Sequence, residues 1–447
     1  MPAGRAGTYP RGRKRGPNKC GPGLDSPPTP GQARPMNDLA DLTASATLAR
    51  IAAGTISFGE VREALAARVA EREPVVRAFT HLNPDPMPGP GPLAGCFFGV
   101  KDVLDTADAP SQYGSPIWAG WQPRGDAACV ALARTAGGAV MGKTVTTEFA
   151  TRHPGPTTNP HNPAHSPGGS SSGSAAGVAA GFFHIGLGTQ TGGSILRPAA
   201  YCGVVGFKPS FGALHRGGMK VMSESLDTIG VITRSVADAA LAMAAMTGGD
   251  YGRPDSAAPR PPRLALVDAN TPETEGLMAS VADACRAKGA AVVVLKLPAI
   301  FAAAMAAHPW VMNMESAQAL AFELATAPEK LSPGLRARML EARAAPATRL
   351  TDGRAAFHAA QDAFAAAIAG FDAVLTPAAP GEAPRGLDDT GDPVFNSLWT
   401  LLHTPAVSVP IGHGPHGLPL GAQIVTPLGQ DAACLMWGEW VRQAVTG

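Results

Sequence analysis

Apolar positions recur along the chain in two alternating patterns, short apolar runs and longer stretches at helical spacing. Helical spacing over residues 39–72 predicts helix up to a Pro-rich stretch at 83–92, which ends the pattern. The next apolar run, at 96–104, predicts a strand, although Lys101 interrupts it. Residues 126–136 then return to helical spacing, so strands and helices alternate from early in the chain.

The alternation continues toward the C-terminus. Further strands are predicted at 139–142, 185–189, 264–267, 291–295, 371–377 and 406–410. Further helices are predicted at 174–180, at 233–247 and over most of 300–370. A long loop rich in Pro, Asn, Ser and Gly at 151–173 and a linker at 248–263 interrupt the pattern. We therefore expect an α/β fold, a single large domain with a central mixed β-sheet covered by helices on both faces.

The first 35 residues differ from the rest of the chain. They are rich in Pro, Gly and basic residues and contain no apolar segment of the kind found in secretory signals. We expect residues 1–35 to be a disordered leader or to precede a true start at Met36, and a basic nucleic-acid arm is the alternative. Residues 36–447 are then the folded domain, and a 45% hydrophobic content supplies it with a large core.

Charge and cysteine usage exclude several classes of protein. A formal net charge of +1 provides no overall field for nucleic acid or acidic lipid. No run of 18 apolar residues lacks Gly, Pro or charge, so no membrane span is expected. The six cysteines lie far apart without a C-x-x-C pair, which argues against a disulfide framework or a zinc site. A cytoplasmic protein with reduced thiols is the simplest interpretation.

Three histidines, His153, His161 and His165, lie in the long loop. No carboxylate or cysteine joins them at the spacing of metal ligands, so we expect no metal and assign them to loop packing or to a pocket wall.

Two segments rich in serine and glycine, at 167–176 and 188–200, carry the candidate chemistry. Neither contains the G-K-[ST] ending of a phosphate-binding loop. Residues 169–173 match the G-x-S-x-G nucleophile elbow with Ser171 at its centre. That elbow must follow a strand, whereas turn-forming residues at 161–167 precede it. Ser171 therefore remains an alternative nucleophile, in an esterase of the α/β-hydrolase type.

The stretch 99–209 resembles the amidase signature family, and the likeness extends over about residues 39–440. The resemblance places a signature core at about 95–235 and implies the amidase signature fold. The matching pieces lie at 99–102, 155–157, 159–160, 167–176, 191–194, 202–209, 225–230 and 372–377.

The resemblance implies a Ser-cisSer-Lys triad, with Ser194 as nucleophile, Ser170 as the bridging serine after a cis peptide bond, and Lys101 as base. A lysine can act as a base only when it is neutral, and the apolar run around Lys101 favours the neutral form. The alternative for Lys101 is a structural ion pair with Asp102. The alternative for Ser170 is a cap for the helix that follows.

The resemblance also places an oxyanion hole at the backbone N–H groups of Thr191, Gly192, Gly193 and Ser194. Two glycines let the backbone approach a tetrahedral intermediate without obstruction by a Cβ atom. The alternative, a tight turn from strand to helix, is needed in either interpretation.

The sequence departs from the commoner family pattern at two positions. Gln190 stands where an acidic residue is usual, and Leu196 stands where an arginine is usual, with Arg197 one position later. The chain therefore resembles the smaller, stand-alone branch that includes malonamidase-like enzymes. Arg197 and Gln190 are candidate substrate-binding residues, and Arg197 suits a small carboxylate-bearing amide. The alternative is a structural Arg197 paired with an acid such as Asp227.

The resemblance implies a linear-amide amidase that works through a covalent acyl-enzyme on a small-molecule amide, without a cofactor and without direct nucleic-acid contact. A homodimer is the expectation at the family level. The alternative function is the A-type subunit of an aspartyl/glutamyl-tRNA amidotransferase complex, in which ammonia passes to a partner.

Overall fold

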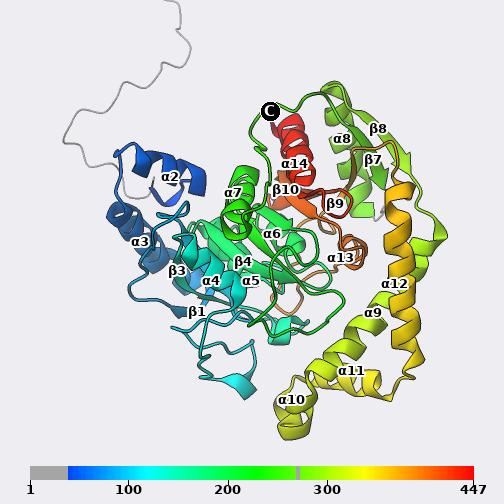
Figure 1. Ribbon diagram of the computed structural model, residues 1–447, viewed down its shortest axis with the longest axis horizontal. Coiled ribbons are helices and arrows are strands. Elements are labelled where there is room, and N and C mark those ends of the chain that lie inside the picture. Colours follow the sequence, from blue (N-terminus) through cyan, green and yellow to red (C-terminus); the bar gives the residue numbers. More distant parts are fainter. Residues whose placement is uncertain (1–38, 268–271) are drawn as a thin grey trace, which may run out of the picture. The chain divides into compact units, whose positions relative to one another are not determined.

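A single mixed sheet of eleven strands runs through the part of the chain that the computed structural model describes, residues 39–267 and 272–447 (Figure 1). The predictions for residues 1–35 lie outside the described residues. The strand order is β1-β3-β2-β4-β6-β5-β10-β11-β9-β7-β8. The strands are β1 (Phe79–Leu82), β2 (Phe97–Lys101), β3 (Ala139–Thr144), β4 (Ile185–Gln190), β5 (Val205–Lys208), β6 (Thr228–Thr233), β7 (Arg263–Val267), β8 (Ala291–Leu295), β9 (Ala373–Pro377), β10 (Ala406–His413) and β11 (Pro419–Val425).

Thirteen α-helices accompany the sheet in the described residues. They are α2 (Ala44–Ala52), α3 (Phe58–Val76), α4 (Ala128–Thr135), α5 (Ser172–Ala180), α6 (Leu196–Tyr201), α7 (Val236–Thr247), α8 (Pro272–Ala287), α9 (Ala299–Ala319), α10 (Ala321–Thr326), α11 (Pro333–Ala344), α12 (Thr348–Ala367), α13 (Ser397–Leu401) and α14 (Asp431–Thr446). None of these helices has both the length and the apolar content that a membrane crossing needs.

The helices cover both faces of the sheet, as predicted. α5 and α6 contact each other and pack on the central strands, whereas α7 and α14 contact each other and also pack on central strands (Figure 1). β6 contacts both α5 and α7, so the two groups of helices enclose the sheet. The predicted α/β fold with a mixed sheet is therefore confirmed.

Four strands escaped prediction, namely β1, β5, β6 and β11. β5 has only four residues, while β6 and β11 contain Gly, Thr or Pro that interrupt the apolar run. Their strand structure depends on pairing, since β6 lies antiparallel between β4 and β5, and β11 lies antiparallel between β10 and β9. β2 also ends at Lys101, earlier than the predicted end of the apolar run.

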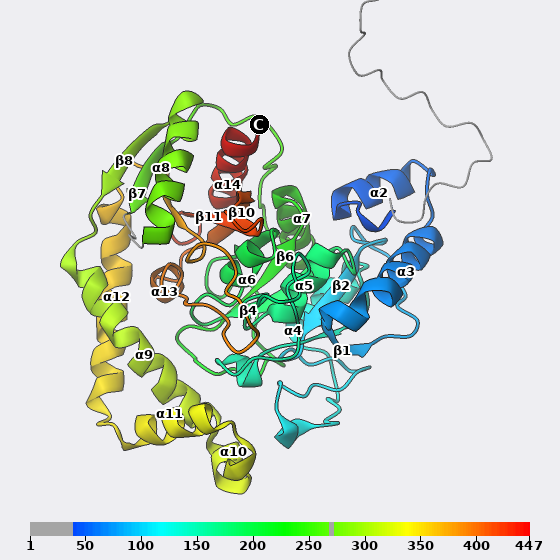
Figure 2. The same cartoon turned by 180° about the vertical axis from the view of Figure 1, so that it is seen from behind.

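The segment predicted as mainly helical, 300–370, folds into α9 to α12. α9 packs along α12 and also contacts α11 and α13. Both views show α9, α11 and α12 beside the sheet, with α10 at the end near α11 (Figures 1 and 2). These helices therefore do not cover the centre of the sheet but form a wall of helices beside it.

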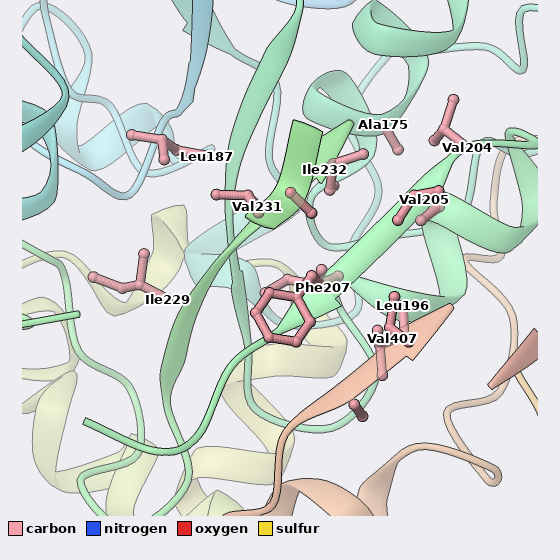
Figure 3. Close-up of a cluster of buried hydrophobic side chains, with 14 of the residues drawn as sticks. Ala175, Leu187, Leu196, Val204, Val205, Phe207, Ile229, Val231, Ile232 and Val407 are labelled. Atoms are coloured by element: carbon pink, nitrogen blue, oxygen red, sulfur yellow. The ribbon is translucent and has the colours of Figure 1, made fainter. Parts of the chain in front are cut away.

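A buried apolar layer lies behind the serine-rich segments. Val205 and Phe207 of β5, Val231 of β6 and Leu196 of α6 are all buried and belong to one cluster (Figure 3). Full burial of each such side chain stabilises the fold by about 1.5–3 kcal/mol. This layer anchors the short helix α6 and the turn that precedes it.

Gly173 of α5 provides a test of how closely that helix approaches the sheet. A Cβ atom at this position would lie 2.3 Å from Ala78 O and 2.4 Å from Val145 N, both backbone atoms. We expect Gly173→Ala to lower the free energy of unfolding by about 1–3 kcal/mol, measured by urea denaturation. The matched control is Gly59→Ala in α3, where the nearest atom, Ser57 Oγ, lies at 3.8 Å. Equal stabilities of the two variants would contradict this packing.

Candidate active site

Two neighbouring parallel strands bring the predicted residues to one edge of the sheet. β2 ends at Lys101 and β4 ends at Gln190, and the two strands pair in parallel. Parallel strands place their carboxyl ends at the same edge, where open α/β sheets generally bind ligands. Ser170 and Ser194 each lie two residues before a helix, α5 and α6 respectively. Residues far apart in the sequence thus meet at one place.

Lys101 is fully buried, and its amine has three hydrogen-bond contacts. Nζ lies 2.7 Å from Ser170 Oγ, 2.7 Å from Thr189 Oγ1 and 3.2 Å from Thr189 O. Burial lowers the pKa of Lys101 well below its ordinary value; the charge of Asp227 opposes this shift and that of Arg197 adds to it. The geometry therefore favours a neutral amine at neutral pH.

Thr189 orients this amine, a role that the sequence did not reveal. A neutral amine has two N–H groups and one lone pair, and the Thr189 carbonyl can only accept a hydrogen bond. With one N–H on Thr189 O and the other on Thr189 Oγ1, the lone pair faces the Ser170 hydroxyl. Thr189 reaches Lys101 only because β4 lies next to β2.

Asp102 does not pair with Lys101, so that alternative is wrong. Its carboxylate lies 3.2 Å from Nζ of Lys143, and both side chains are buried. Lys143 also donates to Leu104 O and to Ser111 Oγ. Burial raises the pKa of Asp102 to about 6 against the opposing charge of Lys143. Two buried lysines thus lie on adjacent strands, and the one with an acidic partner is Lys143.

The three serines considered as nucleophile or relay differ in their access to solvent. The peptide bond between Gly169 and Ser170 is cis. Ser170 and Ser171 are buried, whereas Ser194 is 9% exposed and lines a cavity. Ser171 Oγ donates to Thr189 O at 3.3 Å, and its backbone N–H donates to Ser194 O. The N-cap position of α5 is occupied by Ser171, not by Ser170.

The turn between β4 and α6 presents free backbone donors. Within residues 39–267 and 272–447, the N–H groups of residues 191–194 donate to no other residue. A Cβ atom on Gly193 would lie 2.3 Å from Asn396 Oδ1 and 2.8 Å from Arg197 Nη1, so a side chain does not fit there. Free N–H groups at the wall of a cavity can stabilise a developing negative charge on oxygen.

The cavity at this turn has a volume of about 550 Å³. Residues 191–194 form part of its wall, and α9 and α11 form another part. Residues 388–394 close it on a further side and contribute Asp388, Asp389 and Asp392. The wall of helices beside the sheet therefore has a direct role in shaping the site.

Arg197 lies at the cavity with an unused donor. Nε donates to Thr390 O at 2.8 Å and Nη2 donates to Gly169 O at 2.7 Å. Nη1 is buried and has no hydrogen-bond partner among the described residues. Asp227 instead accepts from Thr191 Oγ1 at 2.5 Å, so a pairing of Arg197 with Asp227 is wrong. Burial lowers the pKa of Arg197, yet a guanidinium remains charged in proteins.

Gln190 lies beneath the turn and does not line the cavity. Its Oε1 accepts from Ile195 N at 2.9 Å and from Leu196 N at 3.1 Å. The structure thus brings Arg197 to the cavity but holds Gln190 behind the residues that form its wall.

Two of the three loop histidines bond to backbone carbonyls. His161 Nε2 lies 2.9 Å from Cys202 O, and His165 Nδ1 lies 2.9 Å from Ala383 O. Among the described residues, no group of His, Cys, Asp or Glu side chains could hold a metal ion.

Comparisons with known proteins found similar sequences and structures. A family model described as Amidase matches residues 85–435. The A-type subunit of the glutamyl-tRNA(Gln) amidotransferase from Chloroflexus aurantiacus (strain ATCC 29366 / DSM 635 / J-10-fl) is 35% identical over 48% of this chain. That match spans about half of the relative's length, 48%. The corresponding A-type subunit from Synechococcus sp. (strain RCC307) is 31% identical over 88% of this chain and 95% of its own length.

A solved structure agrees with the fold. The peptide amidase from Stenotrophomonas maltophilia superimposes with a TM-score of 0.76 at 27% identity. The superposition covers 92% of this chain and 98% of that chain.

The burial of His308 in α9 predicts that the stability of the fold depends on pH. Its Nε2 lies 3.2 Å from Thr191 O and must donate, since a carbonyl only accepts. Burial lowers the pKa of His308 from 6.5 to about 4, although this bond opposes the shift. Between pH 6.5 and about pH 4 the unfolded chain therefore holds a proton on this histidine that the folded chain does not. The stabilisation is fully present above the unfolded pKa and is lost as the pH falls toward 4.

Between pH 7 and pH 4 we expect the free energy of unfolding to fall by on the order of 3 kcal/mol more in the parent than in His308→Gln. Urea unfolding at both pH values measures this difference. The control is His413→Gln, at an exposed histidine. Its free energy of unfolding is expected to fall between pH 7 and pH 4 by as much as that of the parent. An equal loss in His308→Gln and the parent would show that His308 does not cause this dependence.

Proposed function

The chain belongs to the amidase family, and on that premise we propose that it hydrolyses a carboxamide C–N bond and releases ammonia. In this proposal Ser194 is the nucleophile, Ser170 relays the proton and Lys101 is the base. The site requires no cofactor for this chemistry, because each step is a proton transfer or an acyl transfer.

The observation that carries the proposal is the contact of 2.7 Å between Lys101 Nζ and Ser170 Oγ. A serine hydroxyl is a weak nucleophile unless a base takes its proton. The lowered pKa of Lys101 supports its role as that base, and the contact supports Ser170 as the group through which it acts.

In the first step Ser194 Oγ attacks the amide carbon and gives its proton to Ser170, whose own proton passes to Lys101. The carbonyl oxygen gains a negative charge, and the N–H groups of residues 191–194 stabilise it. Removal of one such donor in other enzymes costs about 3–4 kcal/mol of barrier. The unoccupied donors of this turn support that assignment.

In the second step the C–N bond breaks, and the leaving nitrogen takes the proton back from Lys101 through Ser170. Ammonia leaves, and an acyl group remains on Ser194. Water then attacks the acyl carbon while its proton passes along the same route. The acid leaves, Ser194 regains its proton and Lys101 is again neutral, so the cycle closes.

We propose a small carboxylate-bearing amide as the substrate. The buried and unpartnered Nη1 of Arg197 at the cavity supports this class, because an unpaired guanidinium donor is costly unless a ligand pairs with it. Gly169 O and Thr390 O hold the other nitrogens of the guanidinium, so the free donor is fixed in direction.

The alternative function is the A-type subunit of an aspartyl/glutamyl-tRNA amidotransferase complex that passes ammonia to a partner. The relatives named as A-type subunits of glutamyl-tRNA(Gln) amidotransferases support it. Gln190 and Leu196 depart from the commoner pattern and favour the stand-alone hydrolase. Ammonia release by the chain alone distinguishes the two functions.

We expect the full chain to release ammonia from at least one member of a panel of neutral and acidic amides. Ser194→Ala should lower this rate by at least about 10⁴-fold, since it removes the nucleophile. The comparison variant is Ser171→Ala, which tests the esterase alternative. Activity that survives in Ser194→Ala but is lost in Ser171→Ala would overturn the assignment, and release only with a co-purified partner would favour the alternative function.

We expect Arg197→Leu to reduce the ratio of kcat/KM for acidic over neutral amides by about 10- to 100-fold, because a hydrogen bond to a charged group is worth about 1.5–3 kcal/mol. Arg197→Lys keeps the charge without the planar fork and should lose less. Melting temperatures of both variants control for the lost contacts to Thr390 and Gly169. An unchanged ratio in Arg197→Leu would refute the carboxylate proposal.

A further inference from the structure

Side chains of distant elements donate hydrogen bonds to the carbonyls of the turn between β4 and α6. His308 Nε2 donates to Thr191 O at 3.2 Å, and Thr400 Oγ1 donates to Gly192 O at 2.6 Å. In a planar trans peptide the C=O and the following N–H point in opposite directions. A donor on Gly192 O therefore directs the N–H of Gly193 away from Thr400 and fixes its orientation.

Gln190 in turn controls the Thr400 hydroxyl. Gln190 Oε1 accepts from the N–H groups of Ile195 and Leu196, so the other end of its amide must be the nitrogen. That nitrogen, Nε2, donates to Thr400 Oγ1 at 3.0 Å. Because the hydroxyl accepts this bond, its single proton is left for Gly192 O, which lies closer than its other acceptor, Asn396 O at 3.2 Å.

One buried amide thus connects both sides of the turn. Its Oε1 accepts from the N–H groups of Ile195 and Leu196, which follow Ser194. Its Nε2 donates to Thr400, whose hydroxyl in turn donates to Gly192 O. A carboxylate at position 190 could accept the first two bonds but could not donate to Thr400. The hydroxyl proton of Thr400 would then turn to the carboxylate, and Gly192 O would lose its donor.

We propose that Gln190 and Thr400 are positioning residues that orient the Gly193 N–H toward the developing oxyanion, and that Gln190 does not bind substrate. The inference rests on the proposed function, since it assigns a direction to donors of that reaction. Both side chains are fully buried and neither lines the cavity. Their effect should therefore appear in the transition state and not in substrate binding.

The test compares Thr400→Val, Thr400→Ser and Gln190→Glu by steady-state ammonia release with the full chain. Thr400→Val keeps the shape but removes the hydroxyl, and we expect kcat to fall by about 10- to 100-fold with KM within about twofold, less than for complete loss of a donor. Thr400→Ser restores the hydroxyl and should recover most of kcat. Gln190→Glu should lower kcat to a similar extent.

The double variant Gln190→Glu/Thr400→Val tests whether the two residues act in series. If Gln190 acts through Thr400, the double variant should be no slower than Thr400→Val alone. Additive losses would overturn the connection between them. Gln190→Glu also keeps the packing of Thr400, so it decides the question if Thr400→Val does not fold.

A matched control separates positioning from stability. Thr404 is also buried, and its hydroxyl donates to Trp399 O at 3.0 Å, away from the turn. Thr404→Val should lose stability without a comparable loss of kcat. A second readout is the binding of an aldehyde analogue of the best amide, in which Ser194 Oγ adds to the carbonyl carbon. This analogue should bind to Thr400→Val more weakly than to the parent, by the same factor as the fall in kcat.

An unchanged kcat in Thr400→Val and Gln190→Glu, or a change confined to KM, would overturn the inference while leaving the proposed function intact. A parent chain that releases no ammonia from any amide, alone or with a partner, would instead overturn the proposed function and the inference with it.

Discussion

The amine of Lys101 is buried without an acidic hydrogen-bond partner among the described residues, and the rest of the site depends on that constraint. An isolated ammonium in a low-dielectric interior is so unfavourable that the group becomes neutral instead. Lys143, equally buried on the next strand, shows the contrast, because Asp102 lies 3.2 Å from its amine. The same burial thus provides one lysine that suits a base and one that suits an ion pair.

The sheet explains how a neutral lysine comes to face a serine. β2 and β4 are parallel neighbours, so Lys101 and Thr189 lie side by side at their carboxyl ends. Thr189 uses both its carbonyl and its hydroxyl on the amine, which leaves the lone pair for Ser170. The buried apolar layer of β5, β6 and α6 holds the second serine-bearing turn against this edge (Figure 3). Packing and hydrogen bonding of the chain's own residues therefore place these groups.

Elements outside the sheet line most of the cavity. α9 and α11 line the cavity, and so do residues 388–394. The long helices beside the sheet in Figures 1 and 2 therefore shape the pocket, while the strand ends carry Lys101 and Thr189. Arg197 connects the two parts, because its guanidinium reaches Thr390 O from α6, the helix that follows the turn at residues 191–194.

The sequence by itself determined the α/β fold, most of the buried strands and the stretches that carry Lys101, Ser170 and Ser194. The fold, the strands and the serine- and glycine-rich stretches follow from local spacing and composition, whereas the roles of Lys101, Ser170 and Ser194 were implied by the family resemblance. It did not reveal β5 and β6, which owe their strand structure to pairing: β5 pairs with the distant β10 and with β6, and β6 pairs also with β4.

Only the tertiary structure decided the partners of each polar group. It joined Thr189 to Lys101, Asp102 to Lys143, and Gln190 to Thr400, which lies 210 residues away in the chain. It also separated Arg197 from Asp227 and left one guanidinium nitrogen at the cavity without a partner in the part of the chain that the structure describes. The physical reason is that a hydrogen bond depends on position and direction in space, and neither can be read from residue spacing once the partners belong to different elements.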